Sequence, residues 1–141
     1  MAGRLNERRI LVTGAASGMG LAIARLFADE GASLALLDRN EAGVRSAASD
    51  LGAAGYGCDV ADRAQVDAVV AKAAEALGGI DGVINAAGIL ITKQFDLLEA
   101  ESWDRMIAVN LTGPFNVVRS ALPLLRAAPE ATLSTSPRSA R

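Results

Sequence analysis

The stretch of sequence that decides the fold is Thr13-Gly14-Ala15-Ala16-Ser17-Gly18-Met19-Gly20. It follows a short apolar run, Arg9–Thr13, which has the composition of a buried parallel strand. It leads into residues 18–30, whose apolar side chains recur at the spacing of a helix. A glycine-rich turn between a buried strand and a helix is the first part of a βαβ unit, so the stretch predicts an α/β fold.

The alternation of strand and helix patterns continues along the chain. Further strands are expected at residues 33–37, 55–58 and 82–85, and helices at residues 40–51, from Asp59 or Asp62 to Leu77, and at 101–125. The last helix should bend at Gly113-Pro114, because proline removes a backbone hydrogen bond. We predict a Rossmann-type doubly wound parallel sheet, incomplete, with about four strands in the order 3-2-1-4. Residues 1–126 should form this domain, and residues 127–141, which show no period, an irregular tail.

Composition and charge narrow the functional classes. The chain has 141 residues, 51% of them hydrophobic, and a net charge of −2, which gives no electrostatic footprint for nucleic acid. It shows no apolar run long enough for a membrane span and no secretory signal pattern, so we expect a cytoplasmic protein. With no histidine and one cysteine, Cys58, a zinc site or a histidine-based catalytic pair is excluded. We expect Arg4, Arg8 and Arg9 to form a solvated, frayed end.

The glycine-rich turn has the chemistry of a pyrophosphate-binding loop. Glycines there allow a tight turn, a close approach of backbone to ligand and close packing of helix on strand. The N–H groups and positive dipole end of the following helix favour an anion. An acid, Asp38, stands at the end of the next strand, 18 residues after Gly20 and close to the ~20 expected for a group that binds a ribose 2′-OH. The combination predicts a dinucleotide site.

Four motifs in order resemble the short-chain dehydrogenase/reductase family over residues 9–125. The turn has the spacing T-G-x-x-x-G-x-G, and Asp59 follows Cys58 after the third strand. The fourth strand ends in Asn85-Ala86-Ala87-Gly88, and Asn110 lies in Val109-Asn110-Leu111-Thr112-Gly113. We therefore identify the chain as similar to the cofactor-binding half of that family.

The resemblance implies a role for each matching residue. The glycine-loop residues Gly14, Ser17, Gly18, Met19 and Gly20 would line the pyrophosphate and ribose. The remaining contacts would come from Asp38 to the adenosine ribose, Asp59 and Val60 to adenine, Asn85, Ala86 and Gly88 to the nicotinamide-side ribose, and Asn110 as a member of the catalytic tetrad. Two alternatives stay open: Asp59 as a helix cap, and Asn85 as a backbone clamp at the strand end.

Cofactor choice depends on the residues around Asp38. A carboxylate there opposes the extra phosphate of NADP, and Ser17 occupies a position where NADP-using relatives often carry a basic residue. Arg39, beside Asp38, would instead attract that phosphate and so favour NADP. We expect NAD rather than NADP.

Most of the family's catalytic apparatus has no counterpart in the sequence. The family uses a serine, and a tyrosine followed four residues later by a lysine, as its acid–base machinery. The chain has one tyrosine, Tyr56, and two lysines, Lys72 and Lys93, all outside the expected segments. We expect a truncated NAD-dependent oxidoreductase of alcohols or carbonyls that binds cofactor weakly and lacks turnover. A frameshift from about residue 133 is one hypothesis for the missing strand and serine.

Two other functions remain open. A methyltransferase that binds S-adenosylmethionine also has a glycine loop and an acid, but neither Asn85-Ala86-Ala87-Gly88 nor Asn110 belongs to its pattern. A non-enzymatic dinucleotide-binding or oligomerisation module is the stronger alternative, since the resemblance implies a homo-oligomer. Without a fifth strand, the edge of the sheet should also make the chain prone to aggregation.

Overall fold

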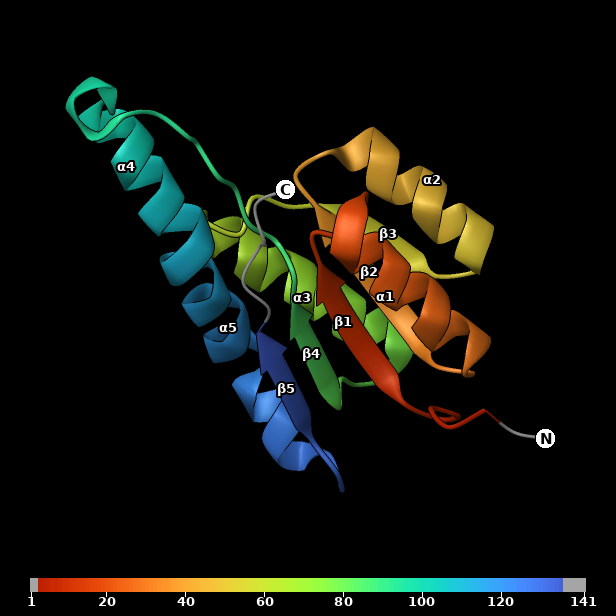
Figure 1. The fold of residues 1–141 in the computed structure, drawn as a ribbon. Helices are drawn as coiled ribbons and strands as arrows, with labels where there is room; N and C mark the ends of the chain where they lie inside the picture. The colour runs from red at the N-terminus through yellow and green to blue at the C-terminus, as the bar shows by residue number, and fades with distance from the viewer. Residues whose placement is uncertain (1–2, 136–141) are drawn as a thin grey trace.

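A computed structural model describes residues 3–135 as one parallel sheet with helices on both faces (Figure 1). The strands are β1 (Arg9–Thr13), β2 (Ser33–Asp38), β3 (Ala54–Gly57), β4 (Gly82–Asn85) and β5 (Thr132–Thr135), in the order β3-β2-β1-β4-β5. The helices are α1 (Gly18–Asp29), α2 (Glu41–Leu51), α3 (Arg63–Leu77), α4 (Ala100–Ile107) and α5 (Gly113–Ala127), with a 3-10 turn η1 (Phe95–Leu97) and a π-helical segment η2 (Ala108–Thr112). The predicted Rossmann-type α/β class is confirmed. Within the described residues, no helix has the length and apolar content needed to cross a membrane.

The sheet separates two hydrophobic cores because successive side chains of a strand point to opposite faces. In β1, Ile10 and Val12 pack toward α1 and α2, whereas Leu11 packs toward α3 and α5. Both faces are covered, which explains why β1 and β2 are apolar without alternation.

The sheet has a fifth strand, so the expectation of about four strands and of an irregular tail is wrong for Thr132–Thr135. This strand pairs in parallel with β4, in the register Gly82↔Thr132 to Asn85↔Thr135. All four of its residues are exposed, and three of them are polar, so the sequence carries no apolar strand pattern. The pairing with β4 is a ladder of backbone groups. The edge of β4 is therefore covered, and β5 becomes the exposed edge strand at which we expect aggregation. Residues 136–141 of the predicted tail lie outside the described part of the chain.

The helix predicted over 101–125 is divided at the expected place. Pro114 has no N–H to donate, and the segment just before it widens to a π-helix in which Gly113 N–H bonds to the carbonyl of Ala108. A Cβ on Gly113 would lie 2.6 Å from Val60 Cγ2, so only glycine lets this segment pack so closely on Val60. The predicted bend is thus a π-helical turn.

The amino ends of β1 and β4 are joined through Asp81, whose side chain is only 7% exposed. Its carboxylate accepts from Arg8 Nε at 2.8 Å and from Arg9 Nε at 3.2 Å. Arg8 also donates to Thr132 Oγ1 at 3.2 Å, and the Thr132 amide donates to the Asp81 carbonyl at 3.0 Å. The expectation that Arg8 and Arg9 form a solvated end is therefore wrong: they neutralise a buried acid 72 to 73 residues away. Only Arg4, which pairs with Glu30, is well exposed.

We predict that Asp81→Asn destabilises the fold by about 2 kcal/mol, measured as a lower urea midpoint. Removing one partner of a buried ion pair costs about 3–5 kcal/mol, and partial exposure of both arginines reduces that value. Asp50→Asn, on an exposed position of α2, is the matched control and should stay within about 0.5 kcal/mol of the parent. A midpoint for Asp81→Asn equal to that of the control would contradict this role.

Candidate functional site

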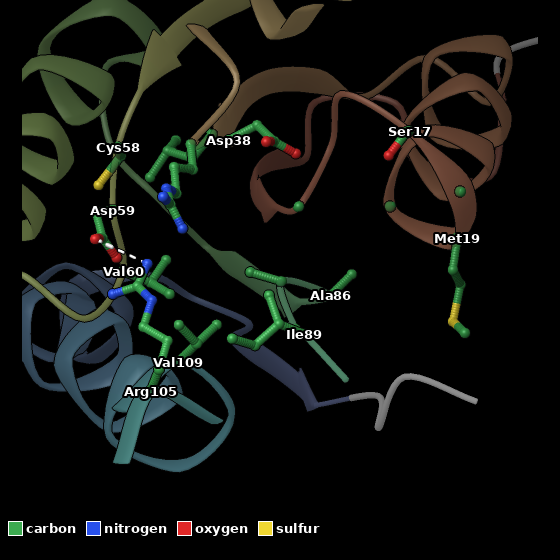
Figure 2. A pocket seen from close by; sticks show the side chains of 17 residues that line it. Ser17, Met19, Asp38, Cys58, Asp59, Val60, Ala86, Ile89, Arg105 and Val109 are labelled. Carbon is green, nitrogen blue, oxygen red and sulfur yellow. Dashed lines mark hydrogen bonds and ion pairs between the residues drawn. The ribbon is translucent and has the colours of Figure 1, made fainter. Parts of the chain in front are cut away.

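A pocket of about 220 Å³ opens where the carboxyl ends of β1, β2 and β4 meet (Figure 2). This is the point at which the strand order reverses, with β2 on one side of β1 and β4 on the other. Ligands of open α/β sheets bind in the crevice at this switch point. The pocket is lined by Gly14, Ser17, Gly18, Met19, Gly20, Leu37, Asp38, Arg39, Cys58, Asp59, Val60, Ala86, Ala87, Gly88, Ile89, Arg105 and Val109.

The structure brings all the predicted site residues to this pocket except Asn85 and Asn110, which lie outside its lining. Their proposed contacts with a cofactor remain predictions. Five residues that were not predicted from the sequence also line the pocket: Leu37, Cys58, Ile89, Arg105 and Val109. Arg105 and Val109 are four residues apart, so helical spacing around Asn110 was the available signal.

The three loop glycines are required for different reasons. Gly14 has φ +68°, and a Cβ there would lie 2.7 Å from backbone atoms of Ala87. A Cβ on Gly20 would overlap the carbonyl of Gly14. Gly18 has φ +58°, but a Cβ there would meet nothing within 4 Å. Gly14 and Gly20 therefore serve the fold, and Gly18 faces free space at the pocket.

The amino end of α1 is available to a ligand. Ser17, its N-cap residue, makes no side-chain capping hydrogen bond, and no acidic residue stands in the first turn. No side chain of the first turn therefore neutralises the positive dipole end of this helix. Such an end favours a negatively charged group.

Asp38 is already oriented by backbone donors. Its Oδ2 accepts from the amide of Ala16 at 3.0 Å, and its Oδ1 accepts from the amide of Asn40 at 2.8 Å. A carboxylate has about four acceptor positions, so capacity remains for donors from the pocket. Asp38 thereby joins the end of β2 to the glycine loop.

Asp59 is not a helix cap. The cap of α3 is Asp62, whose Oδ1 accepts from the amide of Gln65 at 3.0 Å. The Asp59 carboxylate instead accepts from the amide of Ala61 at 3.0 Å and from Arg105 Nη2 at 3.1 Å. The alternative of a capping role is therefore wrong.

Asn85 is buried at the end of β4, 2% exposed, and its Nδ2 atom has no hydrogen-bond partner among the described residues. The strand end is instead held by Thr13, whose Oγ1 accepts from the amides of Ala86 and Ala87 at 3.2 and 3.1 Å. The backbone clamp that was left open for Asn85 is made by Thr13.

Asn110 holds the segment that follows β4. Its Oδ1 accepts from the amide of Ile89, and its Nδ2 donates to the carbonyl of Ile89, both at 2.8 Å. One turn earlier, Met106 Sδ accepts from the amide of Ile91 at 3.4 Å. Asn110 thus acts on the pocket through Ile89, which lines it, rather than by lining it directly.

Comparisons with known proteins identify the family of the chain. The chain belongs to the short-chain dehydrogenase family, whose model, described as short chain dehydrogenase, matches residues 8–133. D-threitol dehydrogenase of Mycolicibacterium smegmatis is 41% identical over 79% of this chain and 45% of its own length. 2,5-Dichloro-2,5-cyclohexadiene-1,4-diol dehydrogenase LinX of Sphingobium indicum is 38% identical over 89% and 52%, and oxidoreductase UcpA of Salmonella typhimurium is 40% identical over 86% and 48%. The chain spans about half the length of these relatives.

We predict that the loop glycines separate into a folding and a binding class. Gly14→Val forces a side chain into the Ala87 backbone and should lower stability by about 3 kcal/mol or abolish folding. Gly18→Val, with open space around it, should keep a cooperative melt at a cost of about 1–2 kcal/mol, from its positive φ. Equal thermal melts of the two variants, followed by circular dichroism, would contradict the assignment.

We also predict that Cys58 reacts slowly. Burial, together with the nearby carboxylates of Asp59 and Asp62, raises the pKa of the Cys58 thiol to about 11. At pH 8 the folded chain should react with an aromatic disulfide reagent about a hundredfold more slowly than the urea-unfolded chain, because the thiolate is the nucleophile. The rate should rise toward pH 11. Cys58 is the only cysteine, so the reaction reports one thiol, and equal rates at pH 8 would refute the prediction.

Proposed function

We propose that this chain binds NAD as the cofactor portion of an oxidoreductase acting on an alcohol or a carbonyl. The observation that supports it most is the meeting, at one pocket, of the glycine loop, the amino end of α1 and the Asp38 carboxylate. Bound NAD supplies the acceptor for a hydride. The relatives that the chain resembles include a D-threitol dehydrogenase and a 2,5-dichloro-2,5-cyclohexadiene-1,4-diol dehydrogenase.

The residues present fit this cofactor. The open space at Gly18 and the amino end of α1 suit a pyrophosphate. Asp38, an acceptor, suits the hydroxyls of the adenosine ribose, and Asp59 with Val60 suits adenine. Residues 86–89, which line the same pocket from the end of β4, suit the nicotinamide-side ribose. We place this binding unit within residues 1–126, with β5 adding a strand to its sheet.

The 141 residues by themselves are proposed to bind cofactor without turnover. The single tyrosine, Tyr56, donates to the carbonyl of Lys72 at 3.4 Å and does not line the pocket. Neither lysine lines the pocket. The Asn110 side chain is hydrogen-bonded to the backbone of Ile89, and no tyrosine or lysine lines the pocket beside it. The substrate class, a cytoplasmic location and the absence of a nucleic-acid partner are part of the same proposal.

A homo-oligomer, or a non-enzymatic module built on one, is a second candidate. Large apolar side chains stand exposed along α4, η2 and α5: Trp103, Ile107, Leu111, Phe115 and Leu122. Exposed apolar patches of this kind mark interaction surfaces or aggregation hazards. A defined oligomer that binds no dinucleotide would favour this alternative.

We predict that NAD binds at least tenfold more tightly than NADP, or ~1.4 kcal/mol, in calorimetric titration. The Asp38 carboxylate accepts from ribose hydroxyls and repels a 2′-phosphate. Asp38→Asn keeps an oxygen for the Ala16 amide and removes the charge, so the preference should shrink to about threefold or less. Asp67→Asn, an exposed acid on α3, is the control and should leave the ratio unchanged. Equal affinities of the parent for both cofactors would defeat the NAD assignment.

A further inference from the structure

Arg105 on α4 pairs with Asp59, which lies in the connection between β3 and α3. Its Nη2 lies 3.1 Å from Asp59 Oδ2, and both residues line the pocket (Figure 2). The two side chains are 31% and 27% exposed, so the pair is partly withdrawn from solvent and less screened than a surface pair. This is an ion pair inside the candidate site, between elements 46 residues apart.

The pair completes the orientation of the Asp59 carboxylate. The Ala61 amide fixes Oδ1 at 3.0 Å, and Arg105 fixes Oδ2. The Asp59 amide in turn donates to Gln65 Oε1 at 3.1 Å, which anchors the backbone. With one donor on each oxygen, the carboxylate cannot rotate freely, and about two of its four acceptor positions remain.

A fixed carboxylate on a pocket wall discriminates between bases by whether the edge of the base presents a hydrogen-bond donor or an acceptor. An exocyclic amino group, as in adenine, can donate to the remaining acceptor positions. An oxo group at the same place would set two acceptors against each other, which leaves a polar atom unpaired and costs affinity. The discrimination is lost if the carboxylate can turn aside.

We propose that Arg105 is a positioning residue: through its ion pair with Asp59 it makes the pocket select a nucleotide whose base carries an exocyclic amino group. The proposal rests on the proposed binding of a dinucleotide and adds the residue that sets base preference. Arg105 acts through Asp59 and needs no contact with the base.

The test compares NAD with nicotinamide hypoxanthine dinucleotide, in which an oxo group replaces the amino group and the adjacent ring nitrogen carries a proton. Dissociation constants are measured by calorimetry for the full chain. The parent should bind NAD at least about tenfold more tightly. Arg105→Met, which removes the charge, should reduce this ratio to about threefold or less, whereas Arg105→Lys, which keeps the positive charge and can still donate to Asp59, should retain most of it.

The control is Arg45→Met, which breaks an exposed ion pair with Glu41 on α2, outside the pocket lining, and should leave the ratio unchanged. Melting curves establish that each variant folds. Should Arg105→Met fail to fold, Asp59→Asn provides the same test, since loss of the carboxylate must also collapse the ratio.

The outcomes separate the two proposals. A parent that binds both dinucleotides equally, or a folded Arg105→Met or Asp59→Asn that keeps the parent's ratio, overturns the role of Arg105 and leaves dinucleotide binding intact. A parent that binds neither dinucleotide overturns the proposed function and the positioning role together. Loss of the ratio in Arg105→Met with retention in Arg45→Met supports the role.

Discussion

The site depends on how closely two backbone segments approach at the carboxyl ends of β1 and β4. Thr13 Oγ1 accepts from two successive amides, those of Ala86 and Ala87. Gly14, the next residue, lies so near Ala87 that any side chain would overlap it. Both the glycine loop and the chain after β4 line the pocket beyond this contact. The close approach of the two strand ends therefore requires glycine at position 14, whether or not a ligand is bound.

The opposite wall of the pocket depends on a missing hydrogen-bond donor. Because Pro114 cannot donate, the helix opens to the π-helical turn η2, and Gly113 lets that turn press on Val60. The continuous segment α4–η2 then contacts both sides of the site. Arg105 holds Asp59 at one end, and Asn110 holds Ile89 at the other. A displacement of this segment would therefore move both ends of the pocket together.

Patterns confined to neighbouring residues were predictable from sequence, and pairings between distant ones were not. The strands β1 to β4, the glycine turn and the helix α2 follow from local composition, and the structure confirms them. The ion pairs of Asp81 with Arg8 and of Asp59 with Arg105 join positions 73 and 46 residues apart, and no local pattern marks such pairs. The last strand, β5, was missed because its residues are all exposed and three of them are polar. The site residues were predicted from motifs. A motif gives the position of a site residue but does not show which distant side chain holds that residue in place.

The pocket presents two carboxylates that are held in a similar way. Asp38 is the last residue of β2, and Asp59 lies two residues after β3. Each has an oxygen that accepts from a backbone amide, that of Ala16 and that of Ala61 respectively. Backbone donors fix these acceptors before any ligand arrives, which reduces the ordering cost of binding. Acceptors that are held in place favour ligand groups that donate, such as hydroxyl and amino groups, and disfavour phosphate and oxo groups beside them. The amino end of α1 has the opposite preference, for an anion. A ligand suited to all three groups therefore carries a negative charge at one place and hydrogen-bond donors to one side of it. This is why we propose a dinucleotide, with its pyrophosphate at α1 and with its ribose hydroxyls and amino group toward Asp38 and Asp59.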